Sequence, residues 1–542
     1  MATVPPPKSK RQKLADTKRT REQQDIELIP ESVPNVVVHL RASDTGDKLA
    51  GELHIPGNST AQQLDLLVNK LLRTEDDRVP YTFSLLTDST NPDSTVIDIT
   101  NDLWTSVLKP GHKTTEDVLT LVYTPQAVFR VRAVSRCSSA ISGHGDAILT
   151  AQFSPASSSR MATGSGDGTA RVWDCDTETP MHTLKGHKSW VLCVSWSPDA
   201  KYIATGSMDN TIRLWDSKAG KALGDAMKGH TKWITGLSWE PYHLQNPDVY
   251  RFVSSSKDQT IRIWNATLRR VELTMSAHSA AVTCVKWGGI GFIYSASQDK
   301  TIKVWDSKDG KLLHNLNAHA HWVNHLALST DFVLRTAYHE HTGKAPATDE
   351  GKVNKAKERF EKAATFGGEA VERLVTASDD FTMYLWEPKK GTKPIARLLG
   401  HQKLVNHVSF SPDGRLIASA SFDNHVKLWD GRDGKFVFSS LYDINFALTG
   451  ASPRFINTLR GHVAPVYQCS FSADSRLLVS CSKDTTLKVW DVKTGKLHTD
   501  LPGHQDEVFA VDWSPDGKKV GSGGKDKVFG CSPARPASSP AR

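Results

Sequence analysis

Short apolar runs alternate with turn residues over most of the chain, from about residue 145 towards the C-terminus. In the stretch 186–216, GHKSWVLCVSWSPDAKYIATGSMDNTIRLWD, the runs VLCVSW, YIATGS and TIRLW are separated by SPDA and MDN. Alternation with a period of two residues, broken by turn residues, predicts three short antiparallel strands. The same unit then recurs along the chain.

Each of the eight copies of the unit carries a histidine and an aspartate, and the first seven carry a tryptophan six residues after the aspartate. The histidines are His144, His187, His230, His278, His319, His401, His462 and His504; the aspartates are Asp167, Asp209, Asp258, Asp299, Asp380, Asp423, Asp484 and Asp526; the tryptophans are Trp173, Trp215, Trp264, Trp305, Trp386, Trp429 and Trp490. A repeat of about 40–45 residues with Gly-His near its start and Trp-Asp near its end indicates a β-propeller blade. The chain therefore resembles the WD-repeat family, and eight copies predict a mainly β fold with an eight-bladed propeller over residues 126–530.

A serine stands two residues before each of the first seven aspartates, which completes a set of four residues per blade. In the second blade these are His187, Ser207, Asp209 and Trp215. The resemblance to WD-repeat blades implies that the set forms a buried hydrogen-bond relay. Serine, histidine and aspartate would also fit a hydrolase triad, but seven copies at one spacing favour the structural interpretation. We therefore expect no enzymatic activity and no small-molecule substrate.

The two ends of the propeller differ from the regular pattern. The run AVFRVRAV, within 126–142, predicts a strand ahead of the first Gly-His. The resemblance to WD-repeat propellers implies that this strand becomes the outer strand of the last blade, which leaves no free sheet edge. In the last blade Ser532 stands where tryptophan is due, and Gly524 stands where the serine is due. Residues 531–542 are therefore predicted to be an aberrant tail.

Two blade boundaries are enlarged, near 337–370 and 437–457. The first contains DEGKVNKAKERFEKAA, whose charge predicts a solvated helix on a long loop; the second lacks this charged character. Long inserted loops are often functional, and an inert decoration is the alternative.

The N-terminal quarter has a different pattern. Residues 1–30 are predicted to be a disordered basic tail, and PPPKSKRQK favours a nuclear localisation signal or an RNA-contacting arm over a merely solvated tail. Over 31–125 the strands PNVVVHLRA, LAGELHIP, YTFSLL, TVIDI and VLTLVYTP surround one helix, STAQQLDLLVNKLL, capped by Ser59 or Thr60. Leu64, Leu66, Leu67 and Leu71 form its expected buried stripe. This order predicts a small α+β domain with a ubiquitin-like roll.

The composition limits the cellular compartment and the kinds of binding partner that we expect. The formal net charge is +8, and the seven cysteines include no CxxC pair, which disfavours zinc binding and a disulfide framework. The chain shows no secretory signal and no run long enough to cross a membrane, so no membrane partner is expected.

Four stretches, PNVVVHLRASDTGD, PYTFSL, TEDVLTLVYTP and SSAISGHGDAIL, joined to an eight-bladed propeller, resemble the Notchless family of large-ribosomal-subunit assembly factors over nearly the full length. The resemblance implies a nuclear and nucleolar ribosome-biogenesis factor whose propeller docks on the pre-large subunit, with assembly factors and ribosomal RNA as partners. It also implies that the ubiquitin-like (NLE) domain engages the AAA+ ATPase midasin. The alternative is a WD-repeat scaffold in Notch-type signalling or ubiquitin ligation.

The resemblance points to one acidic site in the NLE domain. In the family an acidic residue before the last strand is donated to the metal-ion-dependent adhesion site of midasin, and Glu116 in GHKTTEDVLTLVY matches it, with Asp117 beside it. Mg²⁺ takes oxygen ligands and accepts one carboxylate from a partner, so the ion would be shared in trans. The chain is expected to have no cofactor of its own.

The rim of the propeller supplies further candidate partner-binding residues. Three tryptophans follow a blade histidine by three residues, and six side chains immediately precede a turn aspartate. These are Trp190, Trp233 and Trp322, and Met208, Lys257, Gln298, Phe422, Lys483 and Lys525. Exposed aromatic residues with basic neighbours suit a protein or RNA partner. The alternative is that each tryptophan packs into its own blade.

Overall fold

The computed structural model divides into two compact units, Met1–Val128 and Phe129–Arg542. It describes residues 34–42, 48–49, 51–72, 81–86, 96–99, 102–108, 113, 116–125, 139–246, 249–340, 345–366, 369–431 and 455–533. The predicted basic tail over 1–30 lies outside these residues. None of the helices in the described ranges is long and apolar enough to cross a membrane.

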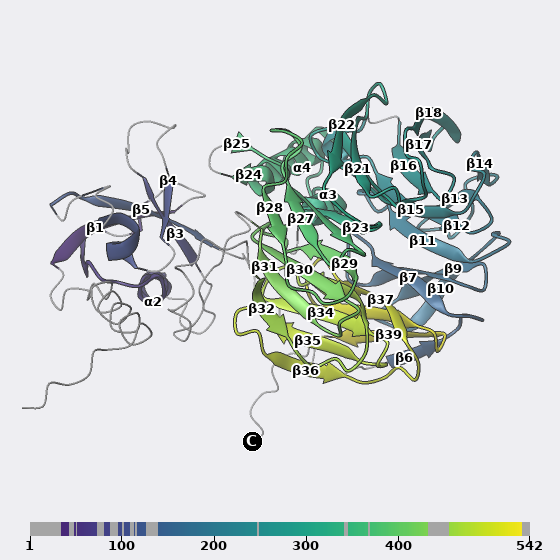
Figure 1. Cartoon of the computed structure of the whole chain (residues 1–542). Helices are drawn as coiled ribbons and strands as arrows, with labels where there is room; N and C mark the ends of the chain where they lie inside the picture. Colours follow the sequence, from purple (N-terminus) through teal and green to yellow (C-terminus); the bar gives the residue numbers. More distant parts are fainter. Residues whose placement is uncertain are drawn as a thin grey trace, which may run out of the picture. The chain divides into compact units, whose positions relative to one another are not determined.

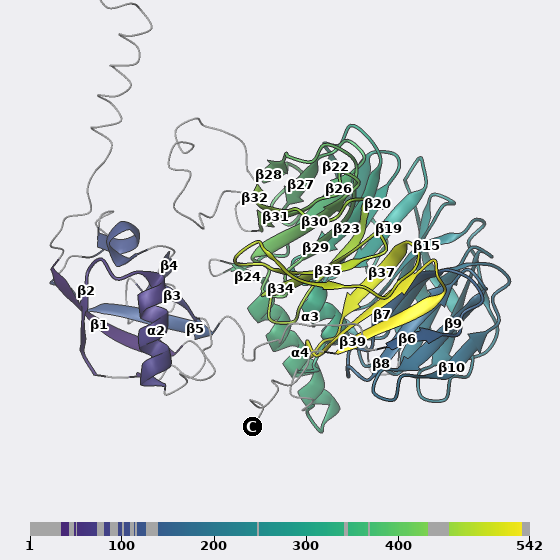
Figure 2. The ribbon, with the colours of Figure 1, turned by 90° about the horizontal axis from the view of Figure 1, so that it is seen from below.

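The N-terminal unit is a five-stranded sheet in the order β2-β1-β5-β3-β4, with one helix across it (Figure 2). Its elements are β1 (Asn35–Ala42), β2 (Leu53–Pro56), α2 (Ala61–Leu71), β3 (Tyr81–Leu86), β4 (Val96–Ile99), the π-helix η1 (Trp104–Leu108) and β5 (Leu119–Pro125). The first and last strands pair in parallel at the centre, and the other pairs are antiparallel. This arrangement confirms the predicted ubiquitin-like roll.

Helix α2 begins at Thr60, whose hydroxyl accepts a hydrogen bond from the backbone N–H of Gln63. Its buried face is formed by positions 64, 67 and 68, because residues three and four apart share one side of a helix. Leu66 and Leu71 are 47% and 38% exposed, so their predicted place in the stripe was wrong. Val68, which completes the stripe, was missed.

The second unit contains eight four-stranded antiparallel sheets. Blade 1 is β7 (Ile148–Phe153), β8 (Arg160–Ser165), β9 (Thr169–Asp174) and β10 (Thr179–Lys185); blade 2 is β11 (Val191–Trp196), β12 (Tyr202–Ser207), β13 (Thr211–Asp216) and β14 (Met227–Lys228); blade 3 is β15 (Ile234–Trp239), β16 (Arg251–Ser256), β17 (Thr260–Asn265) and β18 (Arg270–Ser276); blade 4 is β19 (Val282–Trp287), β20 (Phe292–Ser297), β21 (Thr301–Asp306) and β22 (Leu312–Asn317). A short 3-10 helix, η2 (Tyr242–Leu244), follows β15.

Four further blades complete the ring. Blade 5 is β23 (Val323–Leu328), β26 (Leu374–Ser378), β27 (Met383–Trp386) and β28 (Ala396–Leu398); blade 6 is β29 (Val405–Phe410), β30 (Leu416–Ser421), β31 (Val426–Asp430) and β32 (Phe455–Leu459); blade 7 is β33 (Val466–Phe471), β34 (Leu477–Ser482), β35 (Leu487–Asp491) and β36 (Leu497–Leu501); blade 8 is β37 (Val508–Trp513), β38 (Lys519–Gly524), β39 (Val528–Pro533) and β6 (Ser139–Ser142). The first strand of each blade contacts the first strand of the next, and β37 contacts β7 (Figure 1). The predicted eight-bladed propeller is confirmed.

The two faces of this ring carry different loops. In a four-stranded antiparallel blade, the loop before the first strand and the turn between the second and third strands lie at the same end. We call that end the upper face; it carries the Gly-His loops and the aspartate turns. The loop between the first and second strands lies at the opposite end, the lower face.

Blade 8 joins the two ends of the propeller chain. Strand β6 pairs antiparallel with β39, with Ser142 opposite Val528. A strand from ahead of the first Gly-His therefore does close the ring, but this strand is Ser139–Ser142. The predicted strand AVFRVRAV lies outside the described residues. Strand β39 continues to Pro533, so the predicted aberrant tail is wrong for its first three residues.

We expect the substitution Ser532→Trp to raise the melting temperature of the propeller. Ser532 is buried at the position that tryptophan occupies in the other seven blades, where truncating such a side chain costs about 3–5 kcal/mol. Differential scanning calorimetry measures the change, and Ser532→Ala is the control that adds no apolar surface. An unchanged or lower melting temperature for the tryptophan variant would contradict this account of blade 8.

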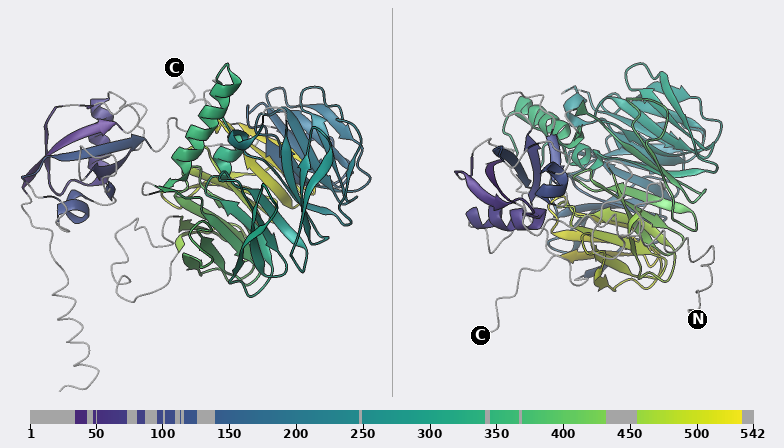
Figure 3. Two further views of the ribbon diagram at one scale, coloured as in Figure 1. Left: turned by 90° about the horizontal axis from the view of Figure 1, so that it is seen from above. Right: turned by 60° about the vertical axis from the view of Figure 1, so that its left-hand side comes forward.

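The enlarged loop of blade 5 is packed rather than solvated. It follows β23 at the lower face and contains α3 (Asp331–Thr336), α4 (Asp349–Ala364) and a small hairpin of β24 (Thr365–Phe366) and β25 (Glu369–Ala370). Helix α4 buries Ala356, Phe360 and Ala364. The Phe360 ring stacks on the His243 ring, with the two ring centroids 4.8 Å apart. The helix pair lies against this face of the ring in Figure 3. The predicted solvated helix was wrong, because an apolar side chain every fourth residue gives the charged segment a buried stripe.

The second predicted insert, 437–457, overlaps a blade. Strand β32 pairs with β31, with Leu459 opposite Val426, and so forms the outer strand of blade 6. Residues 455–457 therefore belong to the sheet, and the rest of the predicted insert lies outside the described residues.

Candidate functional site

The recurring polar residues form one hydrogen-bond relay per blade. In blade 2, His187 Nδ1 lies 3.0 Å from Asp209 Oδ2, and His187 Nε2 lies 2.8 Å from Thr205 Oγ1. Trp215 Nε1 donates to the same hydroxyl at 2.9 Å. The Asp209 carboxylate can only accept a hydrogen bond, so His187 Nδ1 carries the proton. The Trp215 indole can only donate to the Thr205 hydroxyl oxygen, so that hydroxyl donates its own proton to His187 Nε2. The other complete blades repeat this geometry with histidine–aspartate distances of 2.7–3.0 Å.

The linking hydroxyl stands four residues before the aspartate, not two. The linking residues are Thr163, Thr205, Ser254, Ser295, Thr376, Ser419, Ser480 and Ser522. Ser207 is not the linking residue; it donates to the Ser189 carbonyl at 3.0 Å and accepts from Asp209 N–H at 3.1 Å, and so joins the Gly-His loop to the aspartate turn. Gly524 therefore does not interrupt blade 8, which lacks only the tryptophan of the relay.

The relay lowers the pKa of seven aspartates. Burial alone would raise the pKa of the Asp209 carboxyl, but hydrogen bonds from His187, Thr211 and the Lys188 N–H outweigh it and hold the pKa well below its usual range. The same balance lowers the pKa of Asp167 to about 2. The remaining members of this set are Asp258, Asp299, Asp380, Asp423 and Asp484.

We expect the propeller to lose stability in acid over a defined window. Each of these seven carboxyl groups has a lower pKa in the folded chain than its unfolded value of about 4. The stability that comes from this difference is fully present above about pH 5, and it is lost as the pH falls towards the folded-state pKa. The melting temperature should therefore be nearly constant down to about pH 5 and fall steeply below it. Calorimetry at several pH values measures this, and Asp209→Ala should show a shallower fall. A constant melting temperature at about pH 3 would contradict the relay as the cause.

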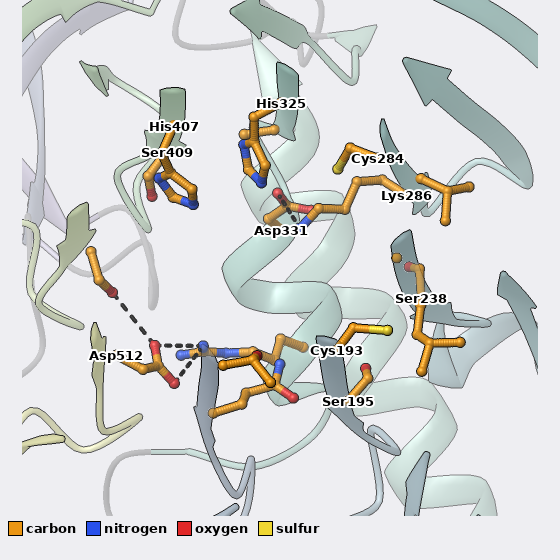
Figure 4. Close-up of a pocket in the computed structure, with 18 of the residues that line it drawn as sticks. Cys193, Ser195, Ser238, Cys284, Lys286, His325, Asp331, His407, Ser409 and Asp512 are labelled. Carbon is orange, nitrogen blue, oxygen red and sulfur yellow. Dashed lines mark hydrogen bonds and ion pairs between the residues drawn. The ribbon is translucent and has the colours of Figure 1, made fainter. Parts of the chain in front are cut away.

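The centre of the ring holds a cavity of about 420 Å³, lined by first strands of several blades and by α3 (Figure 4). Two ion pairs fix α3 there: Arg335 Nη1 lies 2.8 Å from Asp512 Oδ1 of blade 8, and Lys286 Nζ of blade 4 lies 3.2 Å from Asp331. The charged groups thus neutralise one another and tie blades 4, 5 and 8 together. No sequence pattern predicted this link.

Two stacked histidines, His325 and His407, face the same cavity with ring centroids 4.2 Å apart. Burial lowers the pKa of both, to about 3 for His407, so both imidazoles are neutral at physiological pH. Across the described ranges, no group of three or more histidine, cysteine or acidic side chains is arranged to hold a metal ion.

Glu116 lies in the turn that precedes β5, and its side chain is exposed. Asp117 is half-buried, and Val118 beside it is 46% exposed. The Glu116 carboxylate is therefore accessible from outside the domain. Its predicted role in binding the metal ion of midasin stays a prediction.

At the upper face each blade has one pair of residues joined by a backbone hydrogen bond, and the nine candidate rim residues lie in seven of these eight pairs. The pairs are Ala147–Gly166, Trp190–Met208, Trp233–Lys257, Ala281–Gln298, Trp322–Asp379, Leu404–Phe422, Pro465–Lys483 and Glu507–Lys525. Trp190 and Trp322 are 49% and 45% exposed, so for these two the alternative of packing within the blade is excluded.

The pairs differ in character around the ring. Trp233 is half-buried beneath Lys257, whose Nζ lies 3.9 Å from the ring centroid. Lys483 is neutralised by Glu507 at 3.2 Å, and Phe422 packs edge-on against Tyr467. The predicted set of partner-binding residues is thus spread over a whole face and does not form one cluster.

Two families match the chain. The NLE (NUC135) domain matches residues 36–89, and the WD domain, G-beta repeat, matches 135–174, 178–216, 222–265, 269–306, 392–430, 453–491 and 495–529. The range 307–391, which these matches leave out, is where blade 5 carries its insert.

Similarity to proteins of fungi and plants extends over about three quarters or more of the chain. The chain is 58% identical to Ribosome assembly protein 4 of Saccharomyces cerevisiae over 441 residues, which cover 81% of this chain and 85% of that protein. It is 50% identical to the Notchless protein homolog of Arabidopsis thaliana, covering 74% of this chain and 81% of that protein. Among solved structures, the computationally designed Ika8 protein matches with a TM-score of 0.53 at 24% identity, covering 74% of this chain and 100% of that chain; this likeness concerns the fold alone. With both domains matched and these identities sustained over most of its length, the chain belongs to the Notchless family, which includes Ribosome assembly protein 4.

Proposed function

We propose that this chain is a non-enzymatic ribosome-biogenesis factor of the nucleus and nucleolus. Its propeller docks on the pre-large ribosomal subunit, and its NLE domain engages a midasin-type AAA+ ATPase that remodels and releases the particle. The observation that carries the proposal is the similarity to Ribosome assembly protein 4 over both domains. The exposed carboxylate of Glu116 supports the second half.

The chemistry at Glu116 is simple coordination in trans. A divalent ion such as Mg²⁺, held by the ATPase, prefers oxygen ligands and would take one oxygen of the Glu116 carboxylate. The chain supplies the position of that oxygen through the packed end of β5 and the exposure of the turn. The half-exposed Val118 adds apolar surface beside it.

Sedimentation of the tagged chain tests the function class. We expect it to migrate with pre-large-subunit particles in a sucrose gradient of nuclear extract and to carry assembly factors and ribosomal RNA with it. Migration with a ubiquitin ligase or a signalling complex, and absence from pre-ribosomal fractions, would favour the WD-repeat scaffold instead.

A further inference from the structure

Blades 2 and 3 begin with almost the same loop. Residues 185–190 read KGHKSW and residues 228–233 read KGHTKW, so each loop has two lysines around the Gly-His and a tryptophan at its end. The Gly-His loops of the other blades lack this combination. Two adjacent copies of one basic and aromatic loop indicate a surface that repeats its contacts along a repeating ligand.

The two loops form one continuous surface on the upper face, which we call the upper strip. It consists of Trp190, Met208, Asn210, Thr231, Trp233 and Lys257. The backbone N–H of Met208 donates to the Trp190 carbonyl at 2.8 Å, and Asn210 Nδ2 donates to the Thr231 carbonyl at 3.1 Å. The aspartate turn of blade 2 therefore bridges the two loops.

The charge around the upper strip is positive and not neutralised. Lys185, Lys188, Lys228 and Lys232 are all exposed, and within the described part of the chain none of them forms an ion pair. The relay aspartates of these two blades do not neutralise the lysines, because they bond within the relays. Their side chains, Asp209 and Asp258, are 10% and 4% exposed. The same face of blades 7 and 8 differs, because there Lys483 and Lys525 are paired with Glu507 and Asp506.

Two arginines add a fixed charge beneath the loops. The guanidinium of Arg213 packs over Gly186, where a Cβ would lie 2.9 Å from its Cζ, and Arg262 packs over Gly229 in the same way. The Nε atoms of both arginines are buried without a hydrogen-bond partner. In each loop the guanidinium of the same blade therefore lies directly against the glycine.

We propose that the upper strip binds an unpaired segment of RNA. The exposed indole of Trp190 and the half-buried indole of Trp233 give flat rings on which bases stack, and lysines beside them contact the phosphates between those bases. An acidic peptide would match the lysines but leave both indoles without a planar partner. The proposal rests on the proposed function for the source of the RNA, while the binding chemistry stands on this surface alone.

Fluorescence anisotropy with the purified full chain tests the proposal. The probe is a fluorescein-labelled single-stranded RNA of about 12 nucleotides, within the usual range for one such site. Trp190→Ala and Trp233→Ala should each weaken binding roughly tenfold or more. The double charge reversal Lys188→Glu and Lys232→Glu should weaken binding and lower the salt dependence by about 0.7 logarithmic units per lost phosphate contact.

Matched controls lie on the same face. Val463→Ala removes an exposed apolar side chain from the Gly-His loop of blade 7, and Lys403→Ala removes an exposed lysine from that of blade 6; both should leave the affinity unchanged. Full affinity in the two tryptophan variants would overturn the proposal, as would equally tight binding of a duplex RNA of the same length. So would binding of a polyglutamate peptide in place of RNA, which would indicate an acidic protein partner. Because only the chain and synthetic RNA are present, such a failure leaves the sedimentation test of the proposed function unaffected.

Discussion

Glu116→Ala should abolish Mg²⁺-dependent binding of the chain to the metal-binding domain of a midasin-type ATPase. The substitution removes the oxygen that would complete the coordination of the ion, and Glu116→Asp should fail as well, because it withdraws the carboxylate by one methylene. Both variants should fold normally, since the side chain is exposed. Surface plasmon resonance in Mg²⁺ and in EDTA measures the effect.

The NLE domain offers a matched control for this experiment. Glu52 is another exposed glutamate that directly precedes a strand, and Glu52→Ala should bind the ATPase domain like the wild type. Asp117→Ala should bind more nearly like the wild type than Glu116→Ala does. In cells, the Glu116→Ala chain should stay on unreleased particles and act dominantly. Retained binding by this variant, with no effect of EDTA on the wild type, would refute the metal bridge.

Asp209→Ala should destabilise the propeller by about 1–3 kcal/mol, at the upper end of that range, because several donors lose their acceptor together. The Asp209 carboxylate accepts from His187 Nδ1, the backbone N–H of Lys188, and both the N–H and the hydroxyl of Thr211. Calorimetry of the full chain measures the shift of the propeller transition.

The neighbouring substitution Lys188→Ala is the control for Asp209→Ala. It removes an exposed side chain from the same loop but keeps the backbone N–H that bonds to Asp209, so it should leave the melting temperature unchanged. A normally stable Asp209→Ala chain that had lost one chemical activity would refute the structural role of the relay and revive a catalytic one.

The recurring markers were enough to predict the number of blades and the closure of the ring, because each marker occupies one position of a repeated structure. They did not identify the linking hydroxyl of the relay. Thr205 and Ser207 stand two residues apart on one strand, so their side chains point to the same face and both recur at constant spacing. Only the approach of the His187 ring distinguishes them. The recurrence of threonine or serine four residues before each aspartate was nevertheless visible in the sequence.

Contacts between distant segments could not be predicted in the same way. Arg335 and Asp512 are 177 residues apart, and no spacing rule connects them. The packed helix α4 was hidden for another reason: its charged residues outnumber the three apolar ones that it buries. The lysines of the upper strip were visible as the repeated KGH, but their unpaired state follows only from the surrounding side chains.

The closure of blade 8 has a mechanical consequence. Any tension transmitted along the chain from the N-terminal unit enters the propeller at β6, not at the first strand of blade 1. Strand β6 is held in the sheet only by β39, over four residue pairs, and β39 belongs to the opposite end of the propeller chain. A pull on the N-terminal unit therefore loads the seam of the ring before any other blade. Detaching this one strand would open an edge of blade 8 while the other seven sheets keep all four of their strands.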